Sequence, residues 1–193
     1  MKFSVITADP PWSFNDKLTM SSTKRGAAAN YSLLSLADIV ALPVSRVVKD
    51  DSVLALWVPS SMLSDGLSVM EAWGFKQKTI WTWVKTSKSG GLAFGMGRTF
   101  RACSEHALIG TRGKPKCLNR SQRNVSLDPA TRHSEKPETI QDRLELMFNG
   151  PYLELFARRE RPRWTCVGDE CPGTVGVDIR DWFSSQAGAK RVA

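Results

Sequence analysis

The stretch that decides the fold is residues 3–12, which read FSVITADPPW. Its first six residues are mostly β-branched or apolar, a composition that predicts a buried strand. Pro10 and Pro11 end the strand, because a proline nitrogen has no hydrogen to donate to a sheet ladder. Asp9 and Trp12 are therefore expected just beyond the carboxyl end of that strand. Open α/β sheets bind their ligands at this edge.

Working outward, strand and helix patterns alternate along the chain. Further strands are predicted at residues 52–58, 79–84, 105–111 and 152–157. Helices are predicted at residues 35–48, where Ser35 and Asp38 form a capping box, and at 63–73 and 137–148. This alternation implies an α/β fold, a largely parallel sheet with helices on both faces. We expect one domain at 1–176, containing basic loops at 85–104 and 112–132, and a polar tail at 177–193 with a short helix around Trp182.

Length and composition fit a single globular domain of 193 residues, of which 41% are hydrophobic and 24% charged. These values exclude a disordered tail, a fibre or a coiled coil as the main structure. No apolar run can span a bilayer and the first residues lack a signal-peptide core, so we expect a cytoplasmic protein without a membrane partner. The four cysteines lack the spacing of a disulfide scaffold or of paired zinc ligands, which predicts free thiols and no metal site.

The positive charge is concentrated in one central stretch. Residues 76–136 hold 13 Lys or Arg against 3 acids, a balance of +10, whereas the rest of the chain has a balance of −2. Such a surface attracts a polyanion and releases its counterions, although a well-solvated loop is the alternative interpretation. Trp81, Trp83, Phe94 and Phe100 in the same stretch favour nucleic acid, because bases stack on aromatic rings. Trp81 and Trp83 alternate as in a strand, so at least one of them is expected in the core.

The string Asp9-Pro10-Pro11-Trp12 suits a planar aromatic amine. The Asp9 carboxylate and a backbone carbonyl in the proline turn offer two acceptors for two N–H groups, and Trp12 offers a ring for stacking. The exocyclic nitrogen of adenine is such an amine. Two aligned acceptors would draw this nitrogen toward tetrahedral geometry and stabilise the positive charge that develops during alkylation. An ordinary Asp-Pro turn after a strand is the alternative.

The sequence resembles the MT-A70 family of S-adenosylmethionine-dependent adenine-N6 methyltransferases, and the match covers most of the chain, residues 3–173. The matching segments are residues 8–12 (ADPPW), 72–75 (AWGF), 83–86 (WVKT), 110–115 (GTRGKP), 133–137 (HSEKP), 153–158 (LELFAR) and 164–168 (WTCVG). The resemblance implies a Rossmann-like class I methyltransferase with a circularly permuted motif order. In that order the catalytic strand comes first and the cofactor-binding strand comes late. The small size of the chain is similar to that of bacterial and phage DNA-modifying members.

The resemblance also implies a role for each matching residue. Catalysis and orientation of the target amine would fall to Asp9, Pro10, Pro11 and Trp12, with Trp12 also shaping the base pocket. Binding of S-adenosylmethionine would fall to Asp9, Lys136, Glu154, Phe156, Arg158, Gly168, Asp169 and Glu170. Tyr31 would line the substrate side. The alternatives are a surface lysine for Lys136, a structural ion pair for Glu154 and a packing residue for Tyr31.

The two basic loops are the expected grip on the nucleic acid. Their candidate phosphate contacts are Arg98, Arg101, Lys114, Lys116, Arg120 and Arg123. Three departures from the family pattern bear on the cofactor site: only eight residues precede Asp9, the link at 159–163 carries three arginines in place of a His-Asn pair, and Asp169 replaces the usual Asn.

The expected activity is methyl transfer from S-adenosylmethionine to N6 of adenine in DNA, with no covalent intermediate and no metal. RNA is the alternative substrate. A catalytically silent nucleic-acid-binding subunit is the alternative function, and pairing with a second copy of the chain is left open.

Overall fold

The computed structural model describes residues 1–13, 34–95, 97, 99–130 and 135–188. Tyr31 and Arg98, both expected to contact substrate, lie outside the described residues.

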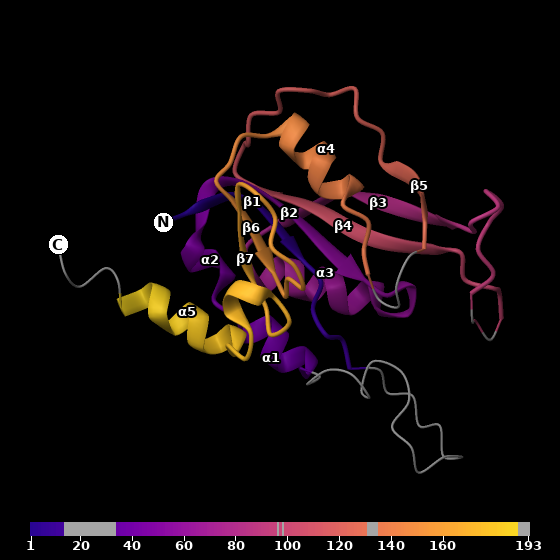
Figure 1. The fold of residues 1–193 in the computed structure, drawn as a ribbon. Coiled ribbons are helices and arrows are strands. Elements are labelled where there is room, and N and C mark those ends of the chain that lie inside the picture. The colour runs from indigo at the N-terminus through magenta and orange to yellow at the C-terminus, as the bar shows by residue number, and fades with distance from the viewer. Residues whose placement is uncertain (14–33, 96, 98, 131–134, 189–193) are drawn as a thin grey trace, which may run out of the picture.

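A seven-stranded sheet runs through the described part of the chain in the order β5-β3-β4-β2-β1-β6-β7 (Figure 1). The strands are β1 (Phe3–Ala8), β2 (Val48–Val58), β3 (Lys76–Thr86), β4 (Ser104–Arg112), β5 (Val125–Pro129), β6 (Tyr152–Leu155) and β7 (Trp164–Val167). Four of the six pairings are parallel, and β4 runs antiparallel to both of its neighbours. The largely parallel sheet predicted from the sequence is confirmed.

The register of the sheet brings the ends of three strands together. Ala8 at the end of β1 pairs with Leu155 at the end of β6, which in turn pairs with the last residue of β7. The residues that follow each strand, Asp9, Phe156 and Gly168, are therefore neighbours. We call this side of the sheet the carboxyl edge and the opposite side the amino edge. The parallel strands β2, β3 and β5 also end at the carboxyl edge, and β4 begins there.

Helices cover both faces of the sheet (Figure 1). On one face lie α1 (Leu36–Ala41), α2 (Val44–Val47), α3 (Leu63–Ala72) and α5 (Ile179–Gly188), and on the other lies α4 (Thr139–Met147). Ile39, Trp73 and Phe183 join the larger core cluster, whereas Ile140 and Leu144 of α4 join a second cluster. Two short 3-10 helices, Ser60–Met62 and Pro172–Thr174, complete the described elements. None of the helices in the described ranges is long and apolar enough to cross a membrane.

The single helix predicted at residues 35–48 is wrong in its length. The capping box of Ser35 and Asp38 opens α1 as expected. Pro43 then ends the helix, because it has no N–H to donate and disfavours helical backbone at Leu42, which is extended. A separate one-turn helix, α2, follows, and Val48 already belongs to β2.

Two short strands are absent from the sequence prediction. β5 forms inside the basic stretch predicted to be a loop at 112–132, and β7 follows β6 after a short link. The helix expected around Trp182 is present as α5, and its Ile179 and Phe183 are buried in the main core. The end of the described chain is thus packed against the domain.

The aromatic residues of the basic stretch divide into two groups. Trp81 and Trp83 are 4% and 3% exposed and belong to the core cluster under α4. Neither ring can therefore stack on a base, which corrects half of the aromatic argument from the sequence. Phe94 and Phe100 are 80% and 84% exposed, on the hairpin connection between β3 and β4.

Candidate active site

The turn after β1 holds the first candidate residues. Asp9 continues the ladder by donating its backbone N–H to the Leu155 carbonyl at 3.4 Å. The Pro10 carbonyl accepts the Trp12 N–H at 2.8 Å, which tightens the turn and leaves the second lone pair of that oxygen for another donor. The turn therefore presents a carboxylate and a carbonyl at the carboxyl edge.

Trp12 braces this turn from inside the protein. Its side chain is 4% exposed, and its indole Nε1–H donates to the Trp57 carbonyl at 2.9 Å. The open ring face that the sequence suggested for Trp12 is therefore buried, because the ring packs in the main core cluster. A contact between Trp12 and substrate stays a prediction.

Acidic and basic side chains alternate in a row that begins at Asp9. Lys136 Nζ donates to Asp9 Oδ2 at 2.9 Å and lies 3.3 Å from Glu105 Oε2. Glu105 also forms an ion pair with Lys85 at the end of β3. Burial alone would lower the pKa of Lys136, but the charges of Asp9 and Glu105 outweigh burial and raise it. Lys136 is therefore a firmly charged cation that fixes one oxygen of the Asp9 carboxylate.

Glu105 is a site residue that the sequence reasoning missed. It lies at the beginning of β4, and only the antiparallel direction of that strand brings it to the carboxyl edge. Burial opposes ionisation of Glu105, but Lys136 and Lys85 overcome that effect and lower its pKa. An acidic residue next to an apolar run is the one sequence signal that could have indicated it.

Glu154 on β6 has a different environment. Gln141 Nε2 donates to Glu154 Oε2 at 2.8 Å, and Cys166 Sγ lies 3.9 Å from the same oxygen. Burial raises the pKa of Glu154 to about 7, against the opposing charge of Arg159 and the Gln141 hydrogen bond. Glu154 is therefore a carboxyl group that changes its charge near neutral pH.

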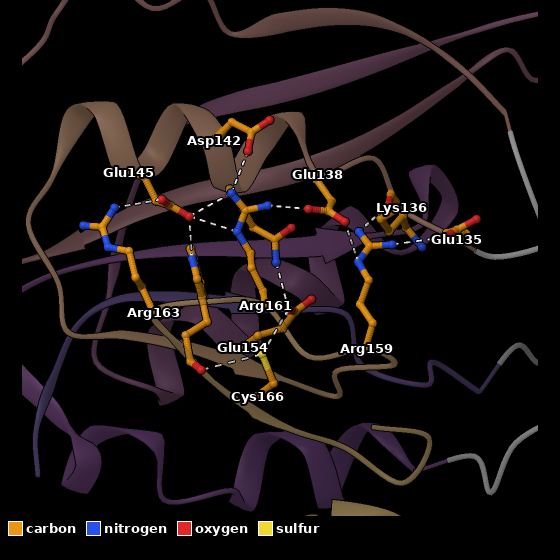
Figure 2. A network of polar contacts seen from close by, with 12 residues as sticks. Glu135, Lys136, Glu138, Asp142, Glu145, Glu154, Arg159, Arg161, Arg163 and Cys166 are labelled. Atoms are coloured by element: carbon orange, nitrogen blue, oxygen red, sulfur yellow. Dashed lines mark hydrogen bonds and ion pairs between the residues drawn. The ribbon is translucent and has the colours of Figure 1, made fainter. Parts of the chain in front are cut away.

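Several arginines form ion pairs with acidic residues of α4 and hold this helix over these groups (Figure 2). Arg161 is paired with three acids on or just before α4, at 2.5 Å for Glu138, 2.6 Å for Asp142 and 2.8 Å for Glu145. Arg159 pairs with Glu138 as well, at 3.0 Å. The arginines that depart from the family pattern thus clamp α4, and with it the segment that carries Lys136.

Two adjoining cavities open at the carboxyl edge. The first, of about 310 Å³, is lined by six of the predicted cofactor residues: Asp9, Lys136, Glu154, Phe156, Arg158 and Glu170. The second, of about 270 Å³, is lined by Gly168 and Asp169 and shares the other four with the first: Asp9, Phe156, Arg158 and Glu170. All eight residues predicted to bind the cofactor therefore line one continuous site.

The backbone has two unusual features where the two cavities meet. Phe156 has a φ of 62°, a left-handed conformation that large side chains rarely adopt. A Cβ on Gly168 would lie 2.1 Å from the Ala157 carbonyl oxygen, so only glycine permits this close approach of β7 to the turn after β6. Such strain and close packing cluster at functional sites.

The charged side chains that line the two cavities fit S-adenosylmethionine. Lys136 and Arg158 can hold a carboxylate, while Asp9, Glu154 and Glu170 can hold an ammonium or hydroxyl groups. Phe156 at the junction offers an aromatic surface. In the described ranges, no three His, Cys, Asp or Glu side chains are grouped to hold a metal ion.

The structure separates the candidate phosphate contacts. Arg101 lies on the β3–β4 connection at the carboxyl edge, with its guanidinium 4.9 Å from the centre of the Phe94 ring. Lys114 lies at the amino edge, where its backbone N–H donates to Asp51 at 2.7 Å. Lys116 follows it, and the nearby Leu118 N–H donates to the carbonyl of Met147 at the far end of α4.

Arg120 and Arg123 are exposed on the segment that leads back toward β5. The structure thus brings Arg101 to the edge that carries Asp9 and leaves Lys114 and Lys116 at the opposite one. Their contacts with nucleic acid stay predictions.

The mostly parallel seven-stranded sheet with helices on both faces has the fold of a Rossmann-like methyltransferase. The sequence model of the MT-A70 family matches residues 3–170, and the chain belongs to this family. It is 30% identical over 190 residues to the type II methyltransferase M.MunI of Mycoplasma sp, with 89% of this chain and 78% of that protein covered.

Two human relatives are longer. The N(6)-adenosine-methyltransferase catalytic subunit METTL3 is 28% identical over 184 residues, with 92% of this chain and 30% of that protein covered. The N(6)-adenine-specific methyltransferase METTL4 is 29% identical over 185 residues, with 87% of this chain and 37% of that protein covered. The chain thus spans about a third of the length of each of these two relatives.

Proposed function

We propose that this protein transfers a methyl group from S-adenosylmethionine to N6 of adenine in DNA. The observation that carries the proposal is the Asp9 carboxylate, fixed by Lys136 at 2.9 Å and placed where the two cavities meet. The similarity to a type II methyltransferase over 78% of its length supports DNA as the substrate.

The turn after β1 would act on the target amine. The Asp9 carboxylate and the Pro10 carbonyl would accept its two N–H groups, which directs the nitrogen lone pair into the site. Because alkylation of an amine develops positive charge on nitrogen, an adjacent preorganised carboxylate stabilises the transition state. Lys136 binds one carboxylate oxygen, so the other can face the amine without the side chain swinging away.

The cofactor would supply an electrophilic methyl group on a sulfonium. Lys136 and Arg158 would hold its carboxylate end, and the acids of the site would hold its ammonium and hydroxyl groups. The rate would then depend mainly on positioning and on electrostatic stabilisation, with no covalent link to the protein.

The β3–β4 connection would contact the nucleic acid near the reacting base. Phe94 and Phe100 are exposed there, and Arg101 adds positive charge. In duplex DNA an adenine must leave the base stack, which costs a few kcal/mol, and exposed rings beside the site can offset part of that cost.

RNA is the second candidate substrate. The relatives named as N(6)-adenosine-methyltransferases favour it, and they match 92% of this chain. A catalytically silent nucleic-acid-binding subunit is the alternative function. Such a subunit would differ from the enzyme in that it would form no methylated product.

The test uses the purified protein with methyl-labelled S-adenosylmethionine and three separate substrates: mixed-sequence duplex DNA, single-stranded DNA and RNA. Products are digested to nucleosides and identified by mass. N6-methyladenine in a DNA arm is the expected result. Label in RNA alone would overturn the substrate class. Absence of both product and cofactor binding would support the silent subunit.

A further inference from the structure

The connection between β3 and β4 exposes two aromatic rings to solvent. Phe94 and Phe100 are 80% and 84% exposed, and Leu92 of the same connection is 65% exposed. A phenylalanine in a soluble protein normally buries its ring, because apolar surface in contact with water is unfavourable. A single exposed apolar residue needs no explanation, but several within one short connection indicate a surface that meets a partner.

Backbone hydrogen bonds fold this connection into two adjacent arms that extend beyond β3 and β4 (Figure 1). The Ala93 N–H donates to the Lys85 carbonyl at 2.8 Å, which turns the chain back along the end of β3. The Gly95 N–H donates to the Ala102 carbonyl at 3.1 Å, and a Cβ at Gly95 would clash with that same oxygen. The two rings therefore lie on neighbouring arms of a narrow projection. We call its residues 92–95 and 99–102 the aromatic tongue.

The aromatic tongue begins at the edge of the sheet that carries Asp9. The Lys85 N–H donates to the Cys103 carbonyl at 2.7 Å, so the chain remains paired up to the base of the tongue. Its second arm leads into β4, where Glu105 lies 3.3 Å from Lys136 Nζ, and Lys136 in turn binds Asp9. The tongue therefore projects from the rim of the candidate active site rather than from a distant surface.

The charge of the connection favours a polyanion as the partner of these rings. Residues 87–104 contain Lys88, Arg98 and Arg101 and neither Asp nor Glu. The guanidinium of Arg101 lies 4.9 Å from the centre of the Phe94 ring, which nevertheless stays largely open to solvent. Because bases stack on aromatic rings and phosphates are attracted to cations, the bases and backbone of a nucleic acid strand fit this surface.

We infer that the aromatic tongue separates the target adenine from its base stack, with Phe94 and Phe100 stacking on the bases that the adenine leaves behind. The inference rests on the proposed function, and it assigns the extrusion of the base to residues that line neither cavity. An adenine that is paired in a duplex must be both unpaired and unstacked, whereas an adenine without a partner base is extruded at a lower cost. The rings should therefore matter most where the target adenine is paired.

The experiment compares the double variant Phe94→Ala/Phe100→Ala with the wild-type protein on two pools of DNA duplexes. Each duplex has random flanks around one adenine, which lies opposite thymine in one pool and opposite an abasic site in the other. That adenine carries a heavy-isotope label, so mass spectrometry counts only its methylation. Leu118→Ala is the matched control, because Leu118 is 51% exposed in the same basic stretch but near the amino edge. The melting temperature and the molar mass in solution are recorded for each variant.

On the pool with paired adenine, the double alanine variant should form N6-methyladenine about tenfold more slowly than the wild-type protein. On the abasic pool its rate should fall by less than about threefold, because less stacking energy is needed there. Phe94→Tyr/Phe100→Tyr keeps both ring faces and should match the wild-type protein on both pools. Leu118→Ala should match it as well.

An equal fall in rate on both pools, or no fall on either, would overturn the inference and leave the proposed function intact. A lower molar mass of the double alanine variant would show that the rings pack against a second copy of the chain, which would also contradict the inference. Absence of product from the wild-type protein on both pools would overturn the proposed function and the inference together.

Discussion

Replacing Lys136 with methionine removes the charge that fixes Asp9 while keeping most of the side-chain volume. The side chains of the pair are 20% and 22% exposed, between a buried and a surface ion pair. Breaking a fully buried pair costs 3–5 kcal/mol, and an exposed pair contributes at most about 1 kcal/mol. A loss of about 2 kcal/mol in the free energy of unfolding is therefore expected. Because Asp9 also loses the cation that fixes its position, kcat/KM for methyl transfer should fall by about tenfold or more.

The assay measures initial rates of methyl transfer to the preferred nucleic acid, with the melting temperature recorded for each variant. Lys49→Met is the matched control, since Lys49 is exposed near the start of β2 at the amino edge. Lys136→Arg should recover part of the rate, because it restores the charge in a different shape. A kcat/KM for Lys136→Met within threefold of wild type would refute the role given to this ion pair.

Three further predictions follow from burial, packing and charge. Burial raises the pKa of Glu154 from 4.5 to about 7. The stability contributed by its protonated form is therefore fully present below about pH 4.5 and is lost as pH rises through 7. Glu154→Gln should remove about 2–3 kcal/mol of this pH dependence from the free energy of unfolding, measured with urea between pH 5 and 8. Gly168→Ala should destabilise the fold by about 2 kcal/mol in the same assay because of its contact with the Ala157 backbone, while Gly91→Ala, whose Cβ would meet only Ser87 at 3.8 Å, should have little effect. Arg101→Glu should weaken DNA binding and reduce the slope of log K against log salt by about 1, whereas Lys114→Glu should do so less; the reverse order in a fluorescence-anisotropy titration would place the nucleic acid on the amino edge.

Much of the site could be predicted because its residues follow strand ends. The prolines after β1 mark the end of the strand, and the order of elements makes β1 and β6 parallel neighbours. Glu154 and Phe156 therefore come close to Asp9, as expected. Lys136 precedes the helix that leads into β6, so it returns to the same edge.

The errors have physical causes that a local pattern does not reveal. Glu105 reaches the site only because β4 runs antiparallel, and strand direction depends on long-range pairing. Lys114 lies at the amino edge for the same reason, although it belongs to the same basic stretch as Arg101. The short strands β5 and β7 are stabilised by neighbours in the sheet, since four or five residues carry too little periodicity to be recognised alone.

The most direct test of the account is the formation of N6-methyladenine by Asp9→Asn beside Asp50→Asn. The Asp50 side chain is 91% exposed and lies near the beginning of β2 at the amino edge, so it controls for loss of a carboxylate as such. Asp9→Asn is expected to bind S-adenosylhomocysteine but to form at least 100-fold less N6-methyladenine than wild type, whereas Asp50→Asn is expected to match wild type. Product from Asp9→Asn at a rate close to wild type would contradict the central claim that Asp9 orients the amine and stabilises its developing charge.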